Sequence, residues 1–302
     1  MNSAFLETSE DARFAEFCAA CRDSKYIGLC FGAPGVGKTV SARRLARWPQ
    51  IEDPAAVNAL SDEALQEVAR RKVIYFTPSV VNSPGSVRDG LRHAATRLRD
   101  VVGEPTRRVN RAILDAQDAA RAAKLERMRT TEDWLQDPLP RVEQPLTWPS
   151  PSRTHWIEPA ELVVIDEADR LRTSSLEEVR DLFDRTGVPV VLVGMPGLEK
   201  RLARHAQLYS RGGFVHAYKP LRPDELGRLL DERWRDLAPG LPKDSVVGED
   251  VISAIVRMTA GNLRLVTRLL DQIRRILALN SLDKVDLGVV DAARESLVIG
   301  PA

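Results

Sequence analysis

The residues with the clearest chemical role form the stretch GAPGVGKT, from Gly32 to Thr39. A glycine, four residues and then Gly37, Lys38 and Thr39 make a phosphate-loop pattern, and the apolar run 26–32 before it is typical of a strand. Glycines let backbone N–H groups approach phosphates, the lysine brings a positive charge, and the threonine hydroxyl reaches Mg²⁺. The pattern predicts triphosphate binding by Gly32, Pro34, Gly35, Val36, Gly37, Lys38, Thr39 and Val40.

An acidic pair supplies the second part of such a site. The apolar run 162–165 is followed directly by Asp166 and Glu167. Alone, acids after a strand more often mark a helix N-cap. Beside a phosphate loop, they predict Asp166 in the magnesium shell and Glu167 as the general base that polarises the attacking water.

Three later positions bear on how hydrolysis would be organised. Met195 follows the strand run 187–194, where many ATPases of this kind place a polar residue, and its thioether cannot position water. Arg211, just before the strand 214–218, is a candidate finger that reaches a neighbouring subunit's nucleotide. The alternative is a solvated basic helix face. Arg264 follows Gly261 and Asn262 at a helix start, from which it could fold over the phosphates; the same pattern is also a common helix entry.

The elements that position these residues alternate along the chain. Buried-strand runs lie at 26–32, 73–78, 161–166 and 187–194, with helical patterns at 61–71 and 174–186 between them. This alternation predicts an α/β fold with a parallel, doubly wound sheet. Beyond residue 220 only helical patterns remain. We therefore expect a nucleotide-binding domain over 1–220 and a small, all-helical lid domain over 221–302.

Residues 103–158 interrupt this alternation with a polar helical pattern, 111–134, and a proline-rich stretch, 136–156. So long an excursion is usually functional or disordered, and partner docking and a plain surface loop are equally compatible with it. Before it, the basic helix 86–100 offers Arg88 and Arg92 as candidate DNA contacts, although most such stripes are solvated faces.

The amino-acid composition argues against several classes of protein. The 302 residues are 43% hydrophobic and 29% charged, as in a soluble globular protein, and the formal charge of +1 gives no global basic field. No apolar run is long enough to span a membrane, which favours a cytoplasmic location. The odd set Cys18, Cys21 and Cys30 argues against a disulfide framework and for a reducing compartment. The pair Cys18 and Cys21 is better read as small buried helix residues than as half of a metal site.

Together, GAPGVGKT, LVVIDE, an arginine before the last strand and GNLR in a helical lid resemble an AAA+ ATPase of the initiator-related kind. Within that group, residues 163–218 resemble the ATPase partners of transposases, the family of the Mu B protein, TnsC and TniB. The resemblance covers about residues 20–290. It implies an ATP- and Mg²⁺-dependent homo-oligomer, a ring or helical filament on double-stranded DNA, which delivers target DNA to a transposase in DNA recombination.

The same resemblance assigns Lys38 and Thr39 to nucleotide and metal, Asp166 and Glu167 to metal and hydrolysis, Arg211 to the finger between subunits and Arg264 to the lid. Hydrolysis is expected to be slow, stimulated by DNA or a partner, and to drive disassembly. An alternative is the same ATPase module acting on a protein partner in secretion, defence or replication initiation and loading.

Overall fold

The computed structural model describes residues 8–130, 146, 156–237 and 248–297. Five parallel strands form one sheet in the order β2-β3-β4-β1-β5. Their bounds are β1 Ile27–Phe31, β2 Val73–Phe76, β3 Leu162–Ile165, β4 Val190–Gly194 and β5 Gly212–Ala217. The parallel α/β sheet predicted from the alternating pattern is confirmed. Each of the four buried-strand runs contains one strand, and β5 begins two residues before the predicted strand 214–218 and ends one residue before its end.

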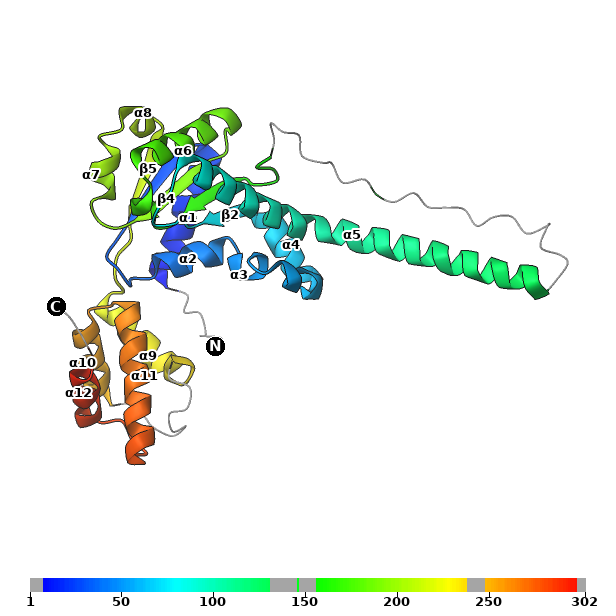
Figure 1. Cartoon of the computed structure of the whole chain (residues 1–302). Helices are drawn as coiled ribbons and strands as arrows, with labels where there is room; N and C mark the ends of the chain where they lie inside the picture. The colour runs from blue at the N-terminus through cyan, green and yellow to red at the C-terminus, as the bar shows by residue number, and fades with distance from the viewer. Residues whose placement is uncertain (1–7, 131–145, 147–155, 238–247, 298–302) are drawn as a thin grey trace.

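Helices cover both faces of the sheet, and a second group lies beyond its carboxyl ends (Figure 1). The first group comprises α1 Ser9–Ser24, α2 Lys38–Leu45, α3 Trp48–Ile51, η1 Pro54–Ala59, α4 Asp62–Arg71, α5 Pro84–Thr130, η3 Ala168–Arg170, α6 Thr173–Thr186, α7 Leu198–Leu202 and α8 Ala206–Tyr209. The second comprises α9 Pro223–Leu237, α10 Glu249–Thr259, α11 Leu263–Asn280 and α12 Leu287–Glu295.

The two groups have separate apolar cores. One buried cluster surrounds the sheet and extends to Tyr218, and the other begins at Leu221 and is built by the last four helices. The helical C-terminal region is therefore present, as its patterns predicted. Gly261, between α10 and α11, packs against the residue at which the second core begins: its φ is +75°, and a Cβ there would lie 1.9 Å from the Leu221 carbonyl oxygen. Only glycine fits a left-handed residue at so close an approach.

Helix α1 explains the cysteine pair. The Thr8 side chain caps the helix by accepting the Asp11 N–H, and the buried side of the helix carries Phe14, Phe17, Cys18 and Cys21. All three cysteines are free and buried. In the described part of the chain, no three His, Cys, Asp or Glu side chains gather as a metal cluster would require.

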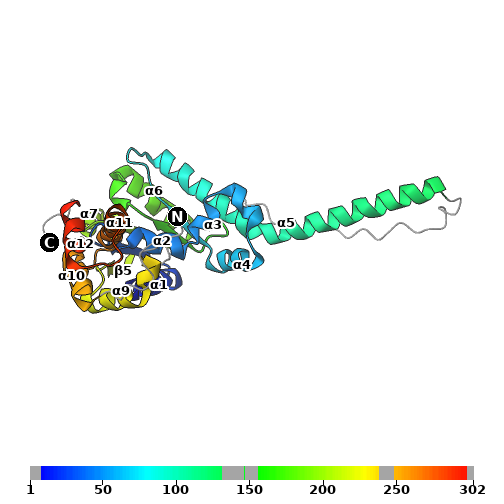
Figure 2. The same ribbon diagram turned by 90° about the horizontal axis from the view of Figure 1, so that it is seen from below.

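Helix α5 corrects the expectation of a short basic helix followed by a separate insertion. It runs unbroken for 47 residues, through Pro105, and its second half projects from the body of the protein (Figures 1 and 2). A proline inside a helix removes one hydrogen bond and crowds the preceding turn. Here the buried Glu104 pairs with Arg107 at 2.9 Å and Arg108 at 3.4 Å, which links the turns on either side of the proline. Most of the proline-rich stretch lies outside the described residues.

Arg108 also anchors the middle of α5 to the neighbouring helices. Its guanidinium bonds the carbonyl oxygens of Asn58 and Leu60 and the Asp62 carboxylate. None of the helices among the described residues has the length and apolar character that crossing a membrane requires.

Candidate functional site

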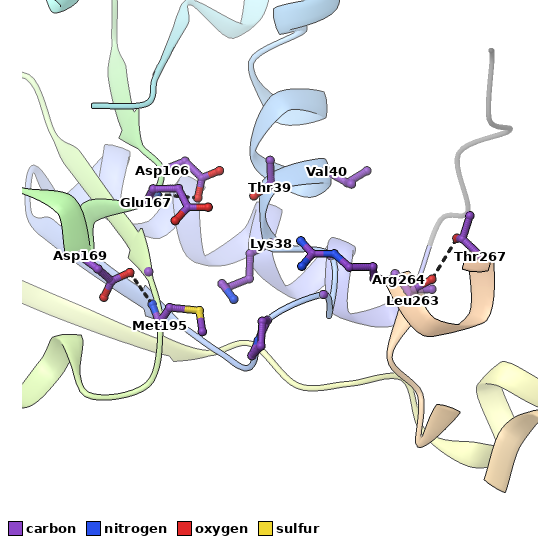
Figure 3. A pocket seen from close by; sticks show the side chains of 14 residues that line it. Lys38, Thr39, Val40, Asp166, Glu167, Asp169, Met195, Leu263, Arg264 and Thr267 are labelled. Atoms are coloured by element: carbon purple, nitrogen blue, oxygen red, sulfur yellow. Dashed lines mark hydrogen bonds between the residues drawn. The ribbon is translucent and has the colours of Figure 1, made fainter. Parts of the chain in front are cut away.

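A cavity of about 430 Å³ lies where the phosphate loop, the ends of β3 and β4 and the start of α11 meet (Figure 3). Nine of the sequence-predicted site residues line it: Pro34, Gly35, Gly37, Lys38, Thr39, Val40, Asp166, Glu167 and Arg264. The same cavity is lined by Asp169, Gly194, Met195, Leu263 and Thr267. Residues more than 200 positions apart in the chain thus form one site.

The phosphate loop connects β1 to the first turn of α2, so the N–H groups of that helix end face the cavity. Gly35 and Gly37 have φ values of +82° and +117°, which favour glycine. Val36 is buried in the core and anchors the loop between them. Gly32 passes so close to the Tyr218 carbonyl oxygen that a Cβ would lie 2.4 Å from it.

Lys38 is almost buried, and its ammonium donates to the carbonyl oxygens of Gly32 at 2.6 Å and Ala33 at 2.8 Å. Burial lowers the pKa of this ammonium below its ordinary value, while acidic groups nearby, Asp166 among them, oppose the shift. The group is a positive charge held inside the loop. It is suited to bind the outer phosphates of a nucleotide.

Asp166 is buried at the end of β3, and no local pattern in the sequence points to the residue that orients it. The Tyr75 hydroxyl on neighbouring β2 donates to Asp166 Oδ2 at 2.9 Å, and Thr77 Oγ1 donates to the Tyr75 oxygen at 3.0 Å. Burial raises the pKa of Tyr75 to about 12, so the phenol keeps its proton at neutral pH. Strand pairing between β2 and β3 brings the tyrosine to this carboxylate.

Glu167 is half-exposed at the cavity and adopts a left-handed conformation with φ of +53°. Its backbone N–H donates to Asp166 Oδ1 at 2.9 Å, and its carboxylate lies 3.9 Å from the Arg170 guanidinium. The side chain is accessible to water in the cavity, as a general base must be.

The lid contributes more than Arg264. Asn262 caps α11 by accepting the N–H groups of Arg264 and Leu265, and its Nδ2 donates to the Pro34 carbonyl oxygen at 2.9 Å. The Arg264 N–H also donates to the Gly35 carbonyl oxygen at 3.1 Å. The Arg264 side chain extends toward Lys38 and Thr39 (Figure 3). The asparagine before a helix was visible in the sequence as a cap, but its bond to the loop was not.

Arg211 lies outside this cavity, at the start of β5. Its Nε and Nη2 bond both carboxylate oxygens of Asp184 on α6, at 2.5 and 2.9 Å. This hydrogen bonding lowers the pKa of Asp184 below its ordinary value. The role of Arg211 between subunits stays a prediction.

The two candidate DNA contacts on α5 are engaged by other groups. Arg88 makes a bidentate pair with the buried Glu178 on α6, at 2.7 and 2.6 Å. The Arg92 guanidinium lies 5.5 Å from the centre of the Trp156 ring. In contrast, Arg97 and Arg111 on the same helix line a separate cavity of about 260 Å³ and have no hydrogen bond or ion pair with the residues that the structure describes.

A divalent cation fits the donors at the first cavity. Thr39 offers a hydroxyl and Asp166 a carboxylate, the hard oxygen ligands that Mg²⁺ prefers. Both lie beside the loop lysine, where a metal ion would be next to the bound phosphates and neutralise part of their charge.

Comparison with known proteins agrees with this geometry. Residues 21–202 match a family model described as "AAA domain". A Staphylococcus aureus protein described as "Potential ATP-binding protein" is 33% identical over 304 residues, which cover 99% of this chain and 98% of that protein.

Two solved structures share the fold at low identity. The Thermotoga maritima RuvB Holliday junction branch migration motor is 16% identical with a TM-score of 0.51, over 97% of this chain and 70% of that one. The Aeropyrum pernix ORC1 protein in complex with DNA is 18% identical with a TM-score of 0.51, over 95% of this chain and 64% of that one.

Proposed function

Because this chain belongs to the family of proteins with an AAA domain, we propose that it is an ATPase that assembles on double-stranded DNA and delivers target DNA to a partner transposase. The observation that carries the proposal is the junction of loop, acidic pair and lid in one cavity. A nucleotide there contacts both parts of the chain. Its binding and loss can therefore change how the parts are arranged, which is the property of a switch.

The chemistry of each turnover is assigned to this chain's own groups. Lys38 and the loop N–H groups hold the outer phosphates, and Arg264 approaches them from the lid. Glu167 accepts the proton of the attacking water. Mg²⁺, held by Thr39 and by Asp166 in its Tyr75 contact, would supply charge neutralisation of the phosphates. The products are ADP and phosphate.

Assembly would place Arg211 of one subunit at the nucleotide of the next. Support comes from its position at the edge strand β5, away from its own cavity, and from its partner. The Asp184 carboxylate holds the guanidinium at the surface, and a phosphate group on a neighbour would replace that carboxylate as its anionic partner. ATP would then favour the assembled state, and hydrolysis would release it.

DNA binding is proposed for α5, the helix that leaves the sheet after β2. Arg88 and Arg92 stay candidate contacts, although Arg88 already pairs with Glu178 and Arg92 lies over the Trp156 ring. Arg97 and Arg111, which are unpaired among the residues described, are added as candidates. One modest basic surface gains avidity when it is repeated along an assembly. Two proteins of the same fold, the RuvB motor and DNA-bound ORC1, act on or bind DNA, which supports this choice of partner.

The experiment is negative-stain imaging of the protein with double-stranded DNA and a slowly hydrolysed ATP analogue, beside ADP and Lys38→Ala samples. We expect rings or filaments that need both DNA and triphosphate. A partner transposase encoded nearby should then be stimulated by the wild type and not by Lys38→Ala. Particles that ignore DNA in every nucleotide state contradict the DNA proposal.

A switch that acts on a protein partner is the second candidate. The observation in its favour is the projecting half of α5, which offers a long exposed helix to another protein (Figure 1). If the protein hydrolyses ATP but ignores DNA, shortening this half of the helix should abolish stimulation by the partner and leave the basal ATPase rate unchanged.

A further inference from the structure

The end of β4 borders the cavity without a polar side chain. Gly194 has none, and Met195 offers only a thioether to the nucleotide side. The structure nevertheless brings a carboxylate to this point from another element. Asp169 lies in η3, three residues after Asp166, and lines the same cavity.

Asp169 bonds the end of β4 directly. Its Oδ2 accepts the Met195 backbone N–H at 2.8 Å (Figure 3). The absence of a side chain at Gly194 permits this approach, because a Cβ there would lie 2.6 Å from Asp169 Oδ2 and 2.6 Å from Leu198 Cδ2. The contact links the turn that carries Glu167 to the neighbouring strand end.

The turn needs such a link. Glu167 has a left-handed backbone, which a non-glycine residue keeps only when its surroundings hold it. Side chains from other elements also hold the backbone that follows Glu167. Arg201 Nη1 donates to the Asp169 carbonyl oxygen at 2.6 Å, and Asn82 Nδ2 donates to the Arg170 carbonyl oxygen at 2.8 Å. The Asp169 side chain connects this turn, residues 167–170, to the end of β4.

We propose that Asp169 is a positioning residue for hydrolysis, which fixes the Glu167 turn and the end of β4 as one unit through the Met195 N–H. The inference rests on the proposed ATPase activity. Asp169 acts through the backbone that it holds and not by contact with the reacting phosphate. A general base displaced by about 1 Å can lose up to about 100-fold in rate.

We expect substitution of Asp169 to slow ATP hydrolysis while leaving nucleotide affinity nearly unchanged. Asp169→Ala removes the acceptor, so single-turnover hydrolysis should slow by about 10- to 100-fold. Affinity for a slowly hydrolysed analogue should change less than about twofold, because the phosphate loop and Arg264 are intact. Asp169→Asn keeps an amide oxygen that can accept the same N–H and should retain most of the rate. Asp118→Ala, an exposed aspartate on α5, is the matched control.

Hydrogen exchange gives a readout that needs no hydrolysis. The Met195 amide should exchange about fivefold faster or more in Asp169→Ala, and near the wild-type rate in Asp169→Asn. Gly194→Ala places a methyl group against the Asp169 carboxylate and displaces it from the Met195 N–H. This variant should therefore show the same slow hydrolysis as Asp169→Ala. The double variant should be no slower than the slower single variant, because both break one contact. Gly194→Ala also serves if Asp169→Ala fails to fold.

Three results would overturn the inference. The first is unchanged exchange of the Met195 amide in Asp169→Ala. The second is single-turnover hydrolysis by Asp169→Ala within twofold of the wild-type rate, and the third is hydrolysis by Asp169→Asn as slow as by Asp169→Ala. The last result would assign the effect to charge and not to the hydrogen bond. Failure of the proposed ATPase function is recognised separately, as a wild-type rate no higher than that of Lys38→Ala, and amide exchange would still decide whether Asp169 holds the strand end.

Discussion

The bond between Asn262 and the phosphate loop gives a prediction whose size follows from the structure. The two polar atoms of the Asn262 amide make different contacts: Oδ1 caps α11, and Nδ2 donates to the Pro34 carbonyl oxygen at 2.9 Å. Loss of an asparagine cap costs about 1 kcal/mol. Loss of one hydrogen bond costs about 1 kcal/mol net. Asn262→Ala loses both and should lower the free energy of local opening by about 2 kcal/mol.

Asn262→Asp separates the two contributions. The carboxylate still caps the helix, but it cannot donate to Pro34, so we expect a loss of about 1 kcal/mol that is confined to the loop contact. Native-state hydrogen exchange is the assay, read in peptides from residues 32–40 and 263–270. A loss of about 1.4 kcal/mol corresponds to tenfold faster exchange under conditions in which closing outpaces exchange.

Asn280→Ala is the matched control, because this asparagine at the other end of α11 donates to the Ile276 carbonyl oxygen at 2.9 Å and is far from the loop. It should leave exchange at residues 32–40 unchanged. The reasoning is refuted if Asn262→Asp exchanges like the wild type in the loop, or if it loses as much protection as Asn262→Ala in the first turn of α11.

Three other predictions concern the core of the site and its surroundings. Because burial lowers the pKa of Lys38, affinity for triphosphate should begin to fall at a lower pH than for an ordinary lysine, and a calorimetric titration repeated between pH 7 and 10 should show this fall. Tyr75→Phe removes a donor to Asp166, so hydrolysis should need more Mg²⁺ and slow by about tenfold at fixed Mg²⁺, while metal-free nucleotide binding is unchanged; equal Mg²⁺ curves would contradict this. Burial raises the pKa of Cys21 and of Cys30 to about 12, so a thiol reagent at pH 8 should label neither until the protein is unfolded, and rapid labelling of the native chain would show that they are accessible.

The sequence alone was sufficient where a property is local. The strands were predictable because buried parallel strands are short apolar runs, and the loop because its chemistry needs glycines and a lysine at fixed spacing. Asp166 and Glu167 were found for the same reason: they follow their strand directly. The position of Arg264 at a helix start was also a local signal, carried by Gly261 and Asn262.

Tertiary structure decided the contacts between distant segments. Strand order brought Tyr75 to Asp166 across 91 positions and Met195 to Asp169 across 26. Lid docking joined Asn262 to Pro34 across 228 positions. Packing of α5 on α6 gave Arg88 a buried partner, Glu178. The ion pairs of Glu104 with Arg107 and Arg108 stabilise α5 across Pro105, which by its local sequence predicts a helix break. Periodicity and spacing specify the strands and the helical patterns between them, whereas the full length of α5 and the hydrogen bonds between elements depend on which elements become neighbours when the core is buried.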